Sequence, residues 1–188
     1  MSISKNSFIT IEKFYAMRSE TDCLLEYIDG IIYMSPSPST KHQRVSSRLQ
    51  LKFGNFLEDG PCEVFVAPYD IELKKEGIEG NKIVIPDISI ICDKKGFTET
   101  KYQGVPALIV EILSPSNQSH DLITKLNLYM KFGVSEYWIV NPMLESITVY
   151  VLNSEGMYEQ FDIKTGKGRV SSKVLSGFEV ALENVFSQ

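Results

Sequence analysis

Two acidic residues interrupt stretches of the chain that are otherwise apolar. Asp87 lies in the segment 83–91 and Glu111 lies in the segment 107–113, so neither acid is expected in a loop. Burying a carboxylate without a partner is unfavourable, and an acid in a buried strand therefore indicates a bound partner or a function. If the two strands are neighbours, both acids can project from the same edge of a sheet, where paired carboxylates share a proton or bind a cation.

Carboxylate oxygens alone favour a hard ion, Mg²⁺ or Mn²⁺, over zinc. We therefore interpret Asp87 and Glu111 as candidate metal ligands and catalytic residues. The alternative is that they are separate structural acids, each held by backbone donors or by an arginine.

A third candidate is a lysine on the helix that follows the Glu111 strand. Asp121, Lys125 and Tyr129 are spaced four residues apart, so they share one helical face. From there Lys125 is expected to reach the acids, orient an attacking water and stabilise the charge of a phosphate in its transition state. The alternatives are a surface ion pair between Lys125 and Asp121 and a place for Tyr129 at the edge of the core.

Two earlier residues are further catalytic candidates. Glu26 lies between Leu25 and Tyr27 in a predicted strand, where it is either a third acid or faces solvent. His42 stands at the start of a predicted helix and is interpreted either as a contact to phosphate or water, or as a capping or packing residue.

The charge of the chain argues against binding nucleic acid by bulk electrostatics. The 188 residues include 19 Lys and Arg and 24 Asp and Glu, a formal net charge of −5. One basic stripe nevertheless recurs at helical spacing and is a candidate nucleic-acid contact, or else a solvated flank: Lys41, Arg44, Arg48 and Lys52. Because a cation would offset the charge of the metal-binding acids, the net charge does not exclude a nuclease and predicts weak, salt-sensitive binding to DNA.

The apolar pattern predicts the elements that must position these residues. A helix over 10–18 begins at the N-cap Thr10 and buries Phe14 and Met17, and Asp29-Gly30 joins the two strands of a hairpin over 24–34. A second helix over 42–58 has a core face made of Val45, Leu49, Phe53, Phe56 and Leu57.

The remaining elements alternate strands with one more helix. Strands are predicted over 63–73, 83–91, 107–113 and 136–140, and a helix over 119–132 ends at Gly133. Short strands follow over 147–152, 157–161 and 180–186. The pattern predicts an α/β (α+β) fold in one domain over 1–188: a core at about 24–150 with a mixed sheet, and a β-rich arm over 151–188.

The cysteines and the start of the chain bear on the compartment. Cys23, Cys62 and Cys92 are far apart and form no zinc-binding pattern, and Cys92 is interpreted as a small buried apolar residue. The first residues lack the layout of a signal peptide, and no apolar run is long enough for a membrane span. We expect a cytoplasmic protein that does not bind membranes.

An ordered series of short motifs resembles the Uma-type restriction endonucleases of the PD-(D/E)XK (restriction-endonuclease-like) superfamily. The series comprises Glu26-Tyr27-x-Asp29-Gly30, His42-Gln43, Pro86-Asp87, Glu111-Ile112-Leu113-Ser114-Pro115-Ser116, Asp121-x-x-x-Lys125-x-x-x-Tyr129 and Gly133-Val134-x-Glu136-Tyr137-Trp138. The resemblance covers about 24–150 and implies an αβββαβ core with a divalent metal on Asp87 and Glu111. The superfamily pattern has a lysine two residues after the second acid, where this chain has Leu113, so the resemblance moves that role to Lys125.

The residues and the resemblance together predict an Mg²⁺- or Mn²⁺-dependent endonuclease that hydrolyses phosphodiester bonds in DNA. A homodimer is expected, since cutting two strands needs two sites and the arm could supply an interface. One alternative is a nuclease fold without turnover that binds DNA or serves assembly, which Leu113 and the net acidity motivate. Another is a hydrolase of a smaller phosphate ester.

Overall fold

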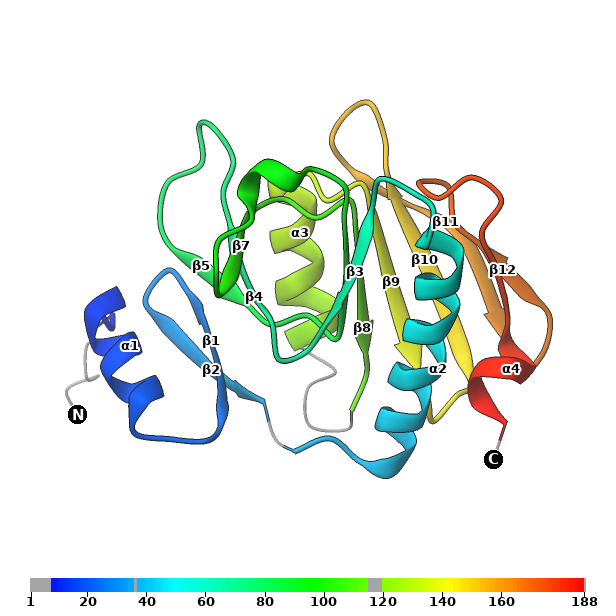
Figure 1. The fold of residues 1–188 in the computed structure, drawn as a ribbon, viewed down its shortest axis with the longest axis horizontal. Coiled ribbons are helices and arrows are strands. Elements are labelled where there is room, and N and C mark those ends of the chain that lie inside the picture. Colours follow the sequence, from blue (N-terminus) through cyan, green and yellow to red (C-terminus); the bar gives the residue numbers. More distant parts are fainter. Residues whose placement is uncertain (1–7, 36, 115–119, 188) are drawn as a thin grey trace, which may run out of the picture.

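The computed structural model describes residues 8–35, 37–114 and 120–187. Within these ranges the strands form two large sheets and one ribbon, with α1 (Ile11–Ser19) at one end of the molecule and α4 (Leu182–Phe186) at the other (Figure 1). The larger sheet has the order β11 (Tyr158–Thr165), β10 (Ser146–Leu152), β9 (Glu136–Asn141), β8 (Leu108–Ile112), β6 (Ile88–Ile91) and β3 (Glu63–Val66). The second has the order β2 (Ile31–Ser35), β1 (Leu24–Ile28), β5 (Lys82–Val84), β4 (Asp70–Leu73) and β7 (Lys101–Gly104), and the ribbon pairs β12 (Arg169–Ser171) with β13 (Glu179–Ala181).

The larger sheet contains the predicted αβββαβ core. Its elements follow the chain as α2 (Thr40–Leu57), β3, β6, β8, a helix and β9. That helix starts with a π-helical segment, η2 (His120–Lys125), and continues as α3 (Leu126–Phe132). Strands β8 and β9 are parallel while the other pairs of this sheet are antiparallel, so the predicted mixed sheet is confirmed.

Two of the predicted strands are each divided between the two sheets. The segment 63–73 forms β3 and β4, with a cis Ala67–Pro68 peptide between them, and the segment 83–91 forms β5 and β6, with Pro86 between them. Proline lacks the N–H that a central strand donates, and β3 and β5 each end two residues before a proline, at Val66 and Val84. Asp87 therefore lies in the bend just before β6, and its predicted place inside a strand is wrong.

The larger sheet is covered on both faces by apolar side chains. Alternate residues of its strands pack against Val45, Leu49 and Phe53 of α2 and against the C-terminal segment. The opposite face packs against α3 and the five-stranded sheet. Because successive strand residues point to opposite faces, Glu111 belongs to the α3 face while its neighbours Val110 and Ile112 belong to the α2 face.

The N-terminal elements follow the sequence with two exceptions. The Thr10 side chain caps α1, Phe14 is buried, and the hairpin turn has positive φ at Asp29 and Gly30, as predicted. Met17 is 36% exposed and Phe56 is 43% exposed, so their predicted burial is wrong. Both lie at the margin of a helical apolar face, where spacing alone does not separate core from surface.

The last predicted strand, 180–186, is also wrong in its second half. Strand β13 ends at Ala181 and α4 begins at Leu182, which buries Leu182, Val185 and Phe186 against the core.

A 3₁₀ turn, η1 (Lys94–Gly96), precedes β7. The predicted start of the second core helix at Ser119 lies outside the described residues. No helix in the described ranges is both long and apolar enough to cross a membrane.

A buried acid ties the C-terminal arm to the core. Glu136 is fully buried at the start of β9, where one carboxylate oxygen accepts hydrogen bonds from the backbone N–H groups of Lys173 (2.7 Å) and Val174 (2.8 Å). Its other oxygen accepts from the indole Nε1 of Trp138 at 2.5 Å. Hydrogen bonds from backbone amides to a charged acceptor are stronger than those to a neutral one, so this contact fixes the arm.

We expect Glu136→Ala to lower the free energy of unfolding by about 3 kcal/mol, because three donors lose a buried acceptor. Glu155→Ala, at an exposed position, is the control and is expected to change it by less than about 0.5 kcal/mol. Denaturant titration followed by the fluorescence of Trp138, the single tryptophan, measures both. The single-domain prediction requires one transition in both proteins, and an arm that unfolds separately would contradict it.

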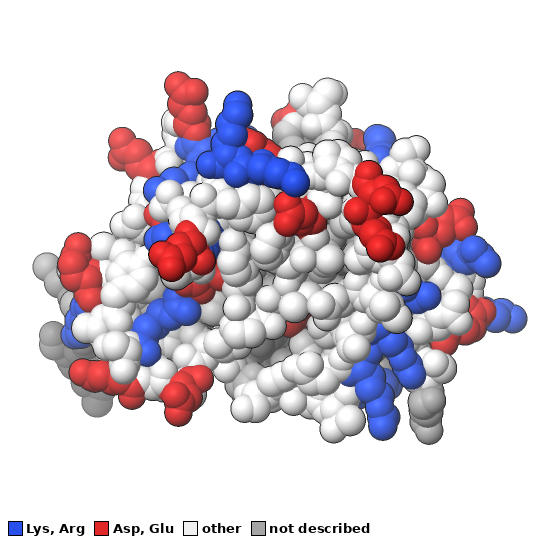
Figure 2. All heavy atoms as spheres, viewed as in Figure 1, with Lys and Arg blue, Asp and Glu red and all other residues white. Residues whose placement is uncertain are grey.

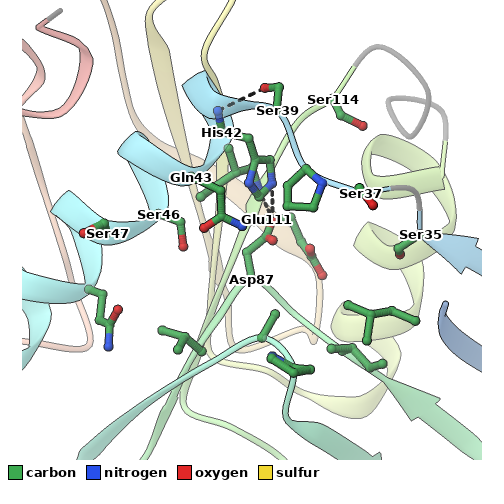
Figure 3. A pocket seen from close by; sticks show the side chains of 18 of the residues that line it. Ser35, Ser37, Ser39, His42, Gln43, Ser46, Ser47, Asp87, Glu111 and Ser114 are labelled. Carbon is green, nitrogen blue, oxygen red and sulfur yellow. Dashed lines mark hydrogen bonds and ion pairs between the residues drawn. The ribbon is translucent and has the colours of Figure 1, made fainter. Parts of the chain in front are cut away.

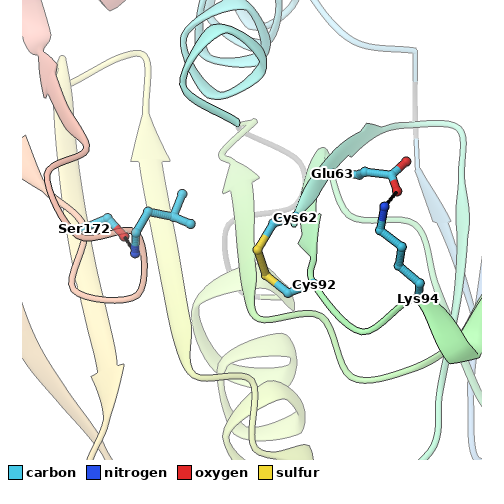
Figure 4. The surroundings of a disulfide bond; sticks show 6 residues. Cys62, Glu63, Cys92, Lys94 and Ser172 are labelled. Atoms are coloured by element: carbon cyan, nitrogen blue, oxygen red, sulfur yellow. Dashed lines mark hydrogen bonds and ion pairs between the residues drawn. A yellow bond between two sulfur atoms is a disulfide. The ribbon is translucent and has the colours of Figure 1, made fainter. Parts of the chain in front are cut away.

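A disulfide links the flanks of two paired strands. Cys62 precedes β3 and Cys92 follows β6, and the antiparallel register that pairs Glu63 with Ile91 places the two cysteines opposite each other (Figure 4). The interpretation of Cys92 as a lone apolar residue is therefore wrong. Sequence could not reveal the pairing, because it depends on the register of strands 30 residues apart. Cys23 is a free, exposed thiol.

An ion cluster crosses the second sheet, where parallel β4 and β7 place Glu72 beside Gln103. Although burial alone would raise the pKa of Glu72, hydrogen bonds from Lys101, Gln103 and Lys74 lower it to about 2. A carboxyl whose pKa falls on folding stabilises the protein above its unfolded pKa, and this stability is lost as the pH drops from about 4.5 to about 2.

We therefore expect the Glu72 carboxyl to account for a loss of about 2 kcal/mol in the free energy of unfolding of wild type as the pH drops from about 4.5 to about 2. The variant Glu72→Gln has no such carboxyl and is expected to lack this loss. Urea titrations of both proteins at a series of pH values from neutral to acid measure the difference. Parallel stability curves for the two proteins would contradict the assignment.

Candidate active site

A cavity of about 480 Å³ opens where the two sheets meet. Its walls come from the first turns of α2, the connection between β2 and α2, and the chain around Pro68 and Asp87. Figure 3 shows Asp87 and Glu111 inside it, with Gln43 and Ser46 of α2 on one side and Ser35 and Ser37 on the other. Of the two prolines that divide the predicted strands, Pro68 lines the cavity, and Pro86 lies between the lining residues Ile85 and Asp87.

Asp87, in the bend just before β6, and Glu111, in the neighbouring strand β8, lie at the same end of these two strands. The antiparallel register pairs Ile88 with Val110, so the next residues, Asp87 and Glu111, are opposite each other. Asp87 Oδ2 accepts a hydrogen bond from the backbone N–H of Ile112 at 2.7 Å, and 19% of the Asp87 side chain is exposed. Both acids line the cavity.

Lys125 reaches Glu111 from the adjacent helix. Its Nζ lies 2.9 Å from Glu111 Oε1 and 3.0 Å from Glu26 Oε1, and the residue is only 3% exposed. The side chain of Asp121, the alternative partner, lies outside the described residues. Lys125 ends the π-helical segment and lines the cavity, so its charge is held beside Glu111.

Tyr129 completes this buried network one turn later. Its hydroxyl donates to Glu111 Oε1 at 2.7 Å, so Lys125 and Tyr129 bind the same oxygen from positions four residues apart. Burial, and then the negative charges of Glu111 and Glu26, raise the pKa of Tyr129 well above its ordinary value. The phenol is therefore a hydrogen-bond donor at physiological pH. Its contact with the acid was not predicted, although its spacing from Lys125 was the signal.

Glu26 is buried, not solvent-facing. It is 1% exposed, and its Oε1 accepts from the backbone N–H of Ile85 at 2.6 Å in addition to contacting Lys125. It belongs to β1 of the second sheet and is not part of the cavity wall. The geometry makes Glu26 a residue that positions Lys125 across the boundary between the sheets.

His42 faces Asp87 from the first turn of α2. Its Nε2 lies 3.3 Å from Asp87 Oδ2, while its backbone N–H donates to the side chain of Ser39, the N-cap of the helix. Capping is therefore performed by Ser39, and the imidazole of His42 lines the cavity beside the carboxylate.

The predicted basic stripe does not form a wall of the cavity. Figure 2 shows Lys and Arg side chains gathered over the N-terminal end of α2, where Lys41 and Arg44 are exposed. Arg48 instead donates to the carbonyl oxygens of Val185 (3.0 Å) and Ser187, which attaches α4 to α2. Lys52 is half-buried further along the helix.

The residues that sequence reasoning missed are uncharged. Gln43, Ser46, Ser47 and Gln50 line the cavity from α2, at positions separated by three, four and seven residues from Gln43. That spacing marks one helical face and was the available signal.

The donor chemistry of the cavity fits a hard divalent ion. Among the described residues, the acids that line it are Asp87 and Glu111, and both offer carboxylate oxygens. Among residues 8–35, 37–114 and 120–187, no three His, Cys, Asp or Glu side chains are placed to enclose an ion. Magnesium is commonly held by only one or two carboxylates, with water and phosphate oxygens completing its shell, so this pair satisfies its requirement.

Comparison of the sequence with models of known protein families shows which family this chain belongs to. The sequence model of Uma2, described as "Putative restriction endonuclease", matches residues 11–183. The chain belongs to the Uma2 family. Uncharacterized protein slr1290 of Synechocystis sp. is 33% identical over 132 residues, which are 70% of this chain and 67% of that protein.

A solved structure shares the Uma2 fold. A crystal structure from Anabaena variabilis, described as "a putative nuclease belonging to DUF820", superposes with a TM-score of 0.75 and 22% identity. The match covers 95% of this chain and 98% of that one. The likeness confirms the predicted mixed α/β (α+β) fold over nearly the whole length of the Uma2 chain.

Proposed function

We propose that this Uma2 protein is a metal-dependent endonuclease that hydrolyses phosphodiester bonds in DNA. The observation that carries the proposal is the convergence of Asp87, just before β6, and Glu111, in β8, on one open cavity beside the ammonium group of Lys125. The restriction-endonuclease description of the family and the nuclease description of the Anabaena protein support the same class of reaction.

In this proposal each residue has a separate task. Asp87 and Glu111 hold Mg²⁺ or Mn²⁺, which supplies an activated water and offsets the charge of the phosphate. Lys125 contributes a positive charge beside the scissile phosphate. Glu26 keeps Lys125 in place, and Tyr129 keeps Glu111 in place. His42 orients Asp87 through its 3.3 Å contact. Exposed Lys41 and Arg44 contact the DNA backbone outside the cavity.

A nuclease fold without turnover is the second candidate, and the burial of Lys125 favours it. The lysine lies between two carboxylates, so much of its charge is already compensated before a phosphate approaches. Leu113, in place of the lysine of the superfamily pattern, adds no second cation. Under this alternative the protein binds DNA or serves assembly without cleaving it.

The experiment that separates the two candidates is the relaxation of supercoiled plasmid by the purified full chain. Nicking in Mg²⁺ or Mn²⁺ that stops in EDTA supports the nuclease. Plasmid binding without nicking in either metal supports the binding module. Cleavage of a chromogenic phosphodiester that duplex DNA does not inhibit would instead support a hydrolase of small phosphate esters.

We further propose a homodimer that acts in the cytoplasm, where DNA is accessible. The dimer would place one site on each strand, with the exposed Phe161 and Ile163 of edge strand β11 in the interface. Sedimentation of the full chain tests the dimer. Because disulfides are rare in reducing compartments, thiol trapping of Cys62 and Cys92 in fresh cell fractions tests the location.

A further inference from the structure

Two sets of side chains with different chemistry line the cavity beside its acidic residues. The wall from α2 carries the neutral polar side chains Gln43, Ser46, Ser47 and Gln50. Apolar side chains from other parts of the chain also line the cavity: Leu24, Val66, Ala67, Pro68 and Ile85. Apart from His42, which contacts Asp87, the wall of α2 therefore presents hydrogen-bonding groups without charge, while the apolar side chains offer surface for an apolar face.

The positive charges of α2 are kept away from this wall. None of the four stripe residues Lys41, Arg44, Arg48 and Lys52 is among the described residues that line the cavity. A phosphate is recognised by arginine and lysine, whereas a wall of amides and hydroxyls suits an uncharged polar ligand. Gln43 and Gln50 are exposed, and within the described part of the chain their amides make no side-chain hydrogen bond, so their donors and acceptors are open to a ligand.

The size of the cavity limits what can enter. A volume of about 480 Å³ lies in the range of sites that enclose one small-molecule-sized group. This volume is too small to enclose a double helix but suits a single nucleotide beside Asp87 and Glu111.

We propose that this cavity is a subsite for one unpaired nucleobase. A base has two apolar faces and a neutral hydrogen-bonding edge, which match the apolar residues and the α2 wall respectively. A glutamine amide presents a donor and an acceptor side by side and can pair with the edge of a base, adenine above all. The inference rests on the proposed nuclease function and narrows its substrate to DNA with an unpaired nucleotide at the cleavage position.

Competition binding with the full chain tests the subsite. The probe is a short fluorescent single strand, and the competitors are the same strand with and without its bases, the latter made of abasic nucleotides. Ca²⁺ replaces Mg²⁺, and fluorescence anisotropy reports binding. Wild type is expected to prefer the strand with bases by about tenfold or more, since contact with one base contributes about 1–3 kcal/mol.

The variant Gln43→Ala/Gln50→Ala is expected to lose about tenfold in affinity for the strand with bases and to keep the wild-type affinity for the abasic strand. Asn55→Ala, an exposed amide on the same helix but outside the cavity, is the matched control and is expected to behave as wild type. Circular dichroism verifies that each variant is folded, which the exposure of these side chains favours.

Equal affinity of wild type for the two strands, or binding of neither, would overturn the subsite. An equal loss for both strands in the double variant would overturn it as well. Plasmid nicking by wild type in Mg²⁺ keeps the two proposals apart. A preference for the strand with bases, without nicking, supports the subsite and contradicts the nuclease. Nicking without that preference supports the nuclease and contradicts the subsite.

Discussion

Asp87→Asn is expected to reduce metal-dependent nicking of DNA by about 10³-fold or more while leaving the fold intact. The variant removes one of the two carboxylate charges that would hold the ion, and the ion contributes several kcal/mol to charge stabilisation in the transition state. The amide oxygen of asparagine can still accept the 2.7 Å hydrogen bond from the Ile112 N–H, so the bend before β6 is preserved. Initial rates on supercoiled plasmid across a range of Mg²⁺ concentrations measure the effect.

Asp59→Asn, an exposed acid just after α2, is the control for the loss of one negative charge and is expected to keep the wild-type rate. If Asp87→Asn nicks at the wild-type rate at every Mg²⁺ concentration, Asp87 is not a metal ligand. A rate restored by a large excess of Mg²⁺ would show instead that the loss lies in metal affinity, which agrees with the assignment.

Lys125→Met is expected to lower the free energy of unfolding by about 3–5 kcal/mol and to abolish nicking. Removing one member of a buried ionic cluster leaves the others uncompensated, and here Glu26 and Glu111 would face each other without a cation. Thermal or urea unfolding followed by circular dichroism measures the loss. Lys131→Met, an exposed lysine on the same helix, is the control and is expected to change stability by less than about 0.5 kcal/mol.

The double variant Glu26→Gln/Lys125→Met separates charge from packing. Removing the Glu26 charge together with the lysine leaves a single buried carboxylate, so we expect the double variant to be more stable than Lys125→Met by about 1–3 kcal/mol. Nicking stays absent, because the cation beside Glu111 is still missing. If the second substitution lowers stability further, the contact between Glu26 and Lys125 does not provide the coupling that the structure indicates.

The sequence predicted the core because local signals and global packing agree there. The continuous apolar runs around Glu111 and before Asn141, the helical spacing of Val45, Leu49 and Phe53, and the glycine at 133 each have a direct physical cause in burial or backbone conformation. The prediction was wrong for the segments 63–73 and 83–91, each of which was predicted as one strand but passes from one sheet to the other. Periodicity reports that a residue is buried, but it does not report against which sheet.

The candidate site shows the same division between what is local and what is not. Residue types and spacing were sufficient to select Asp87 and Glu111 as acids in segments that are expected to be buried, and Lys125 as a cation on the following helix. The partners of these residues depend on contacts across long stretches of chain, since Glu26 and Lys125 are joined only where the first hairpin reaches the second core helix. Likewise, helical spacing does not reveal that the Arg48 side chain binds the C-terminal segment, because that contact forms only where α4 returns to α2.

The sequence by itself determined the chemistry available to this protein: two carboxylates and a lysine in otherwise apolar surroundings, on a core that belongs to the Uma2 family. Only the tertiary structure decided how that chemistry is arranged. It brought the two acids together, buried the lysine between Glu26 and Glu111, and placed His42 and the amides and hydroxyls of α2 beside them. The physical reason is that burial and charge are properties of single residues, whereas register, ion pairing and cavity shape arise only when distant segments pack together.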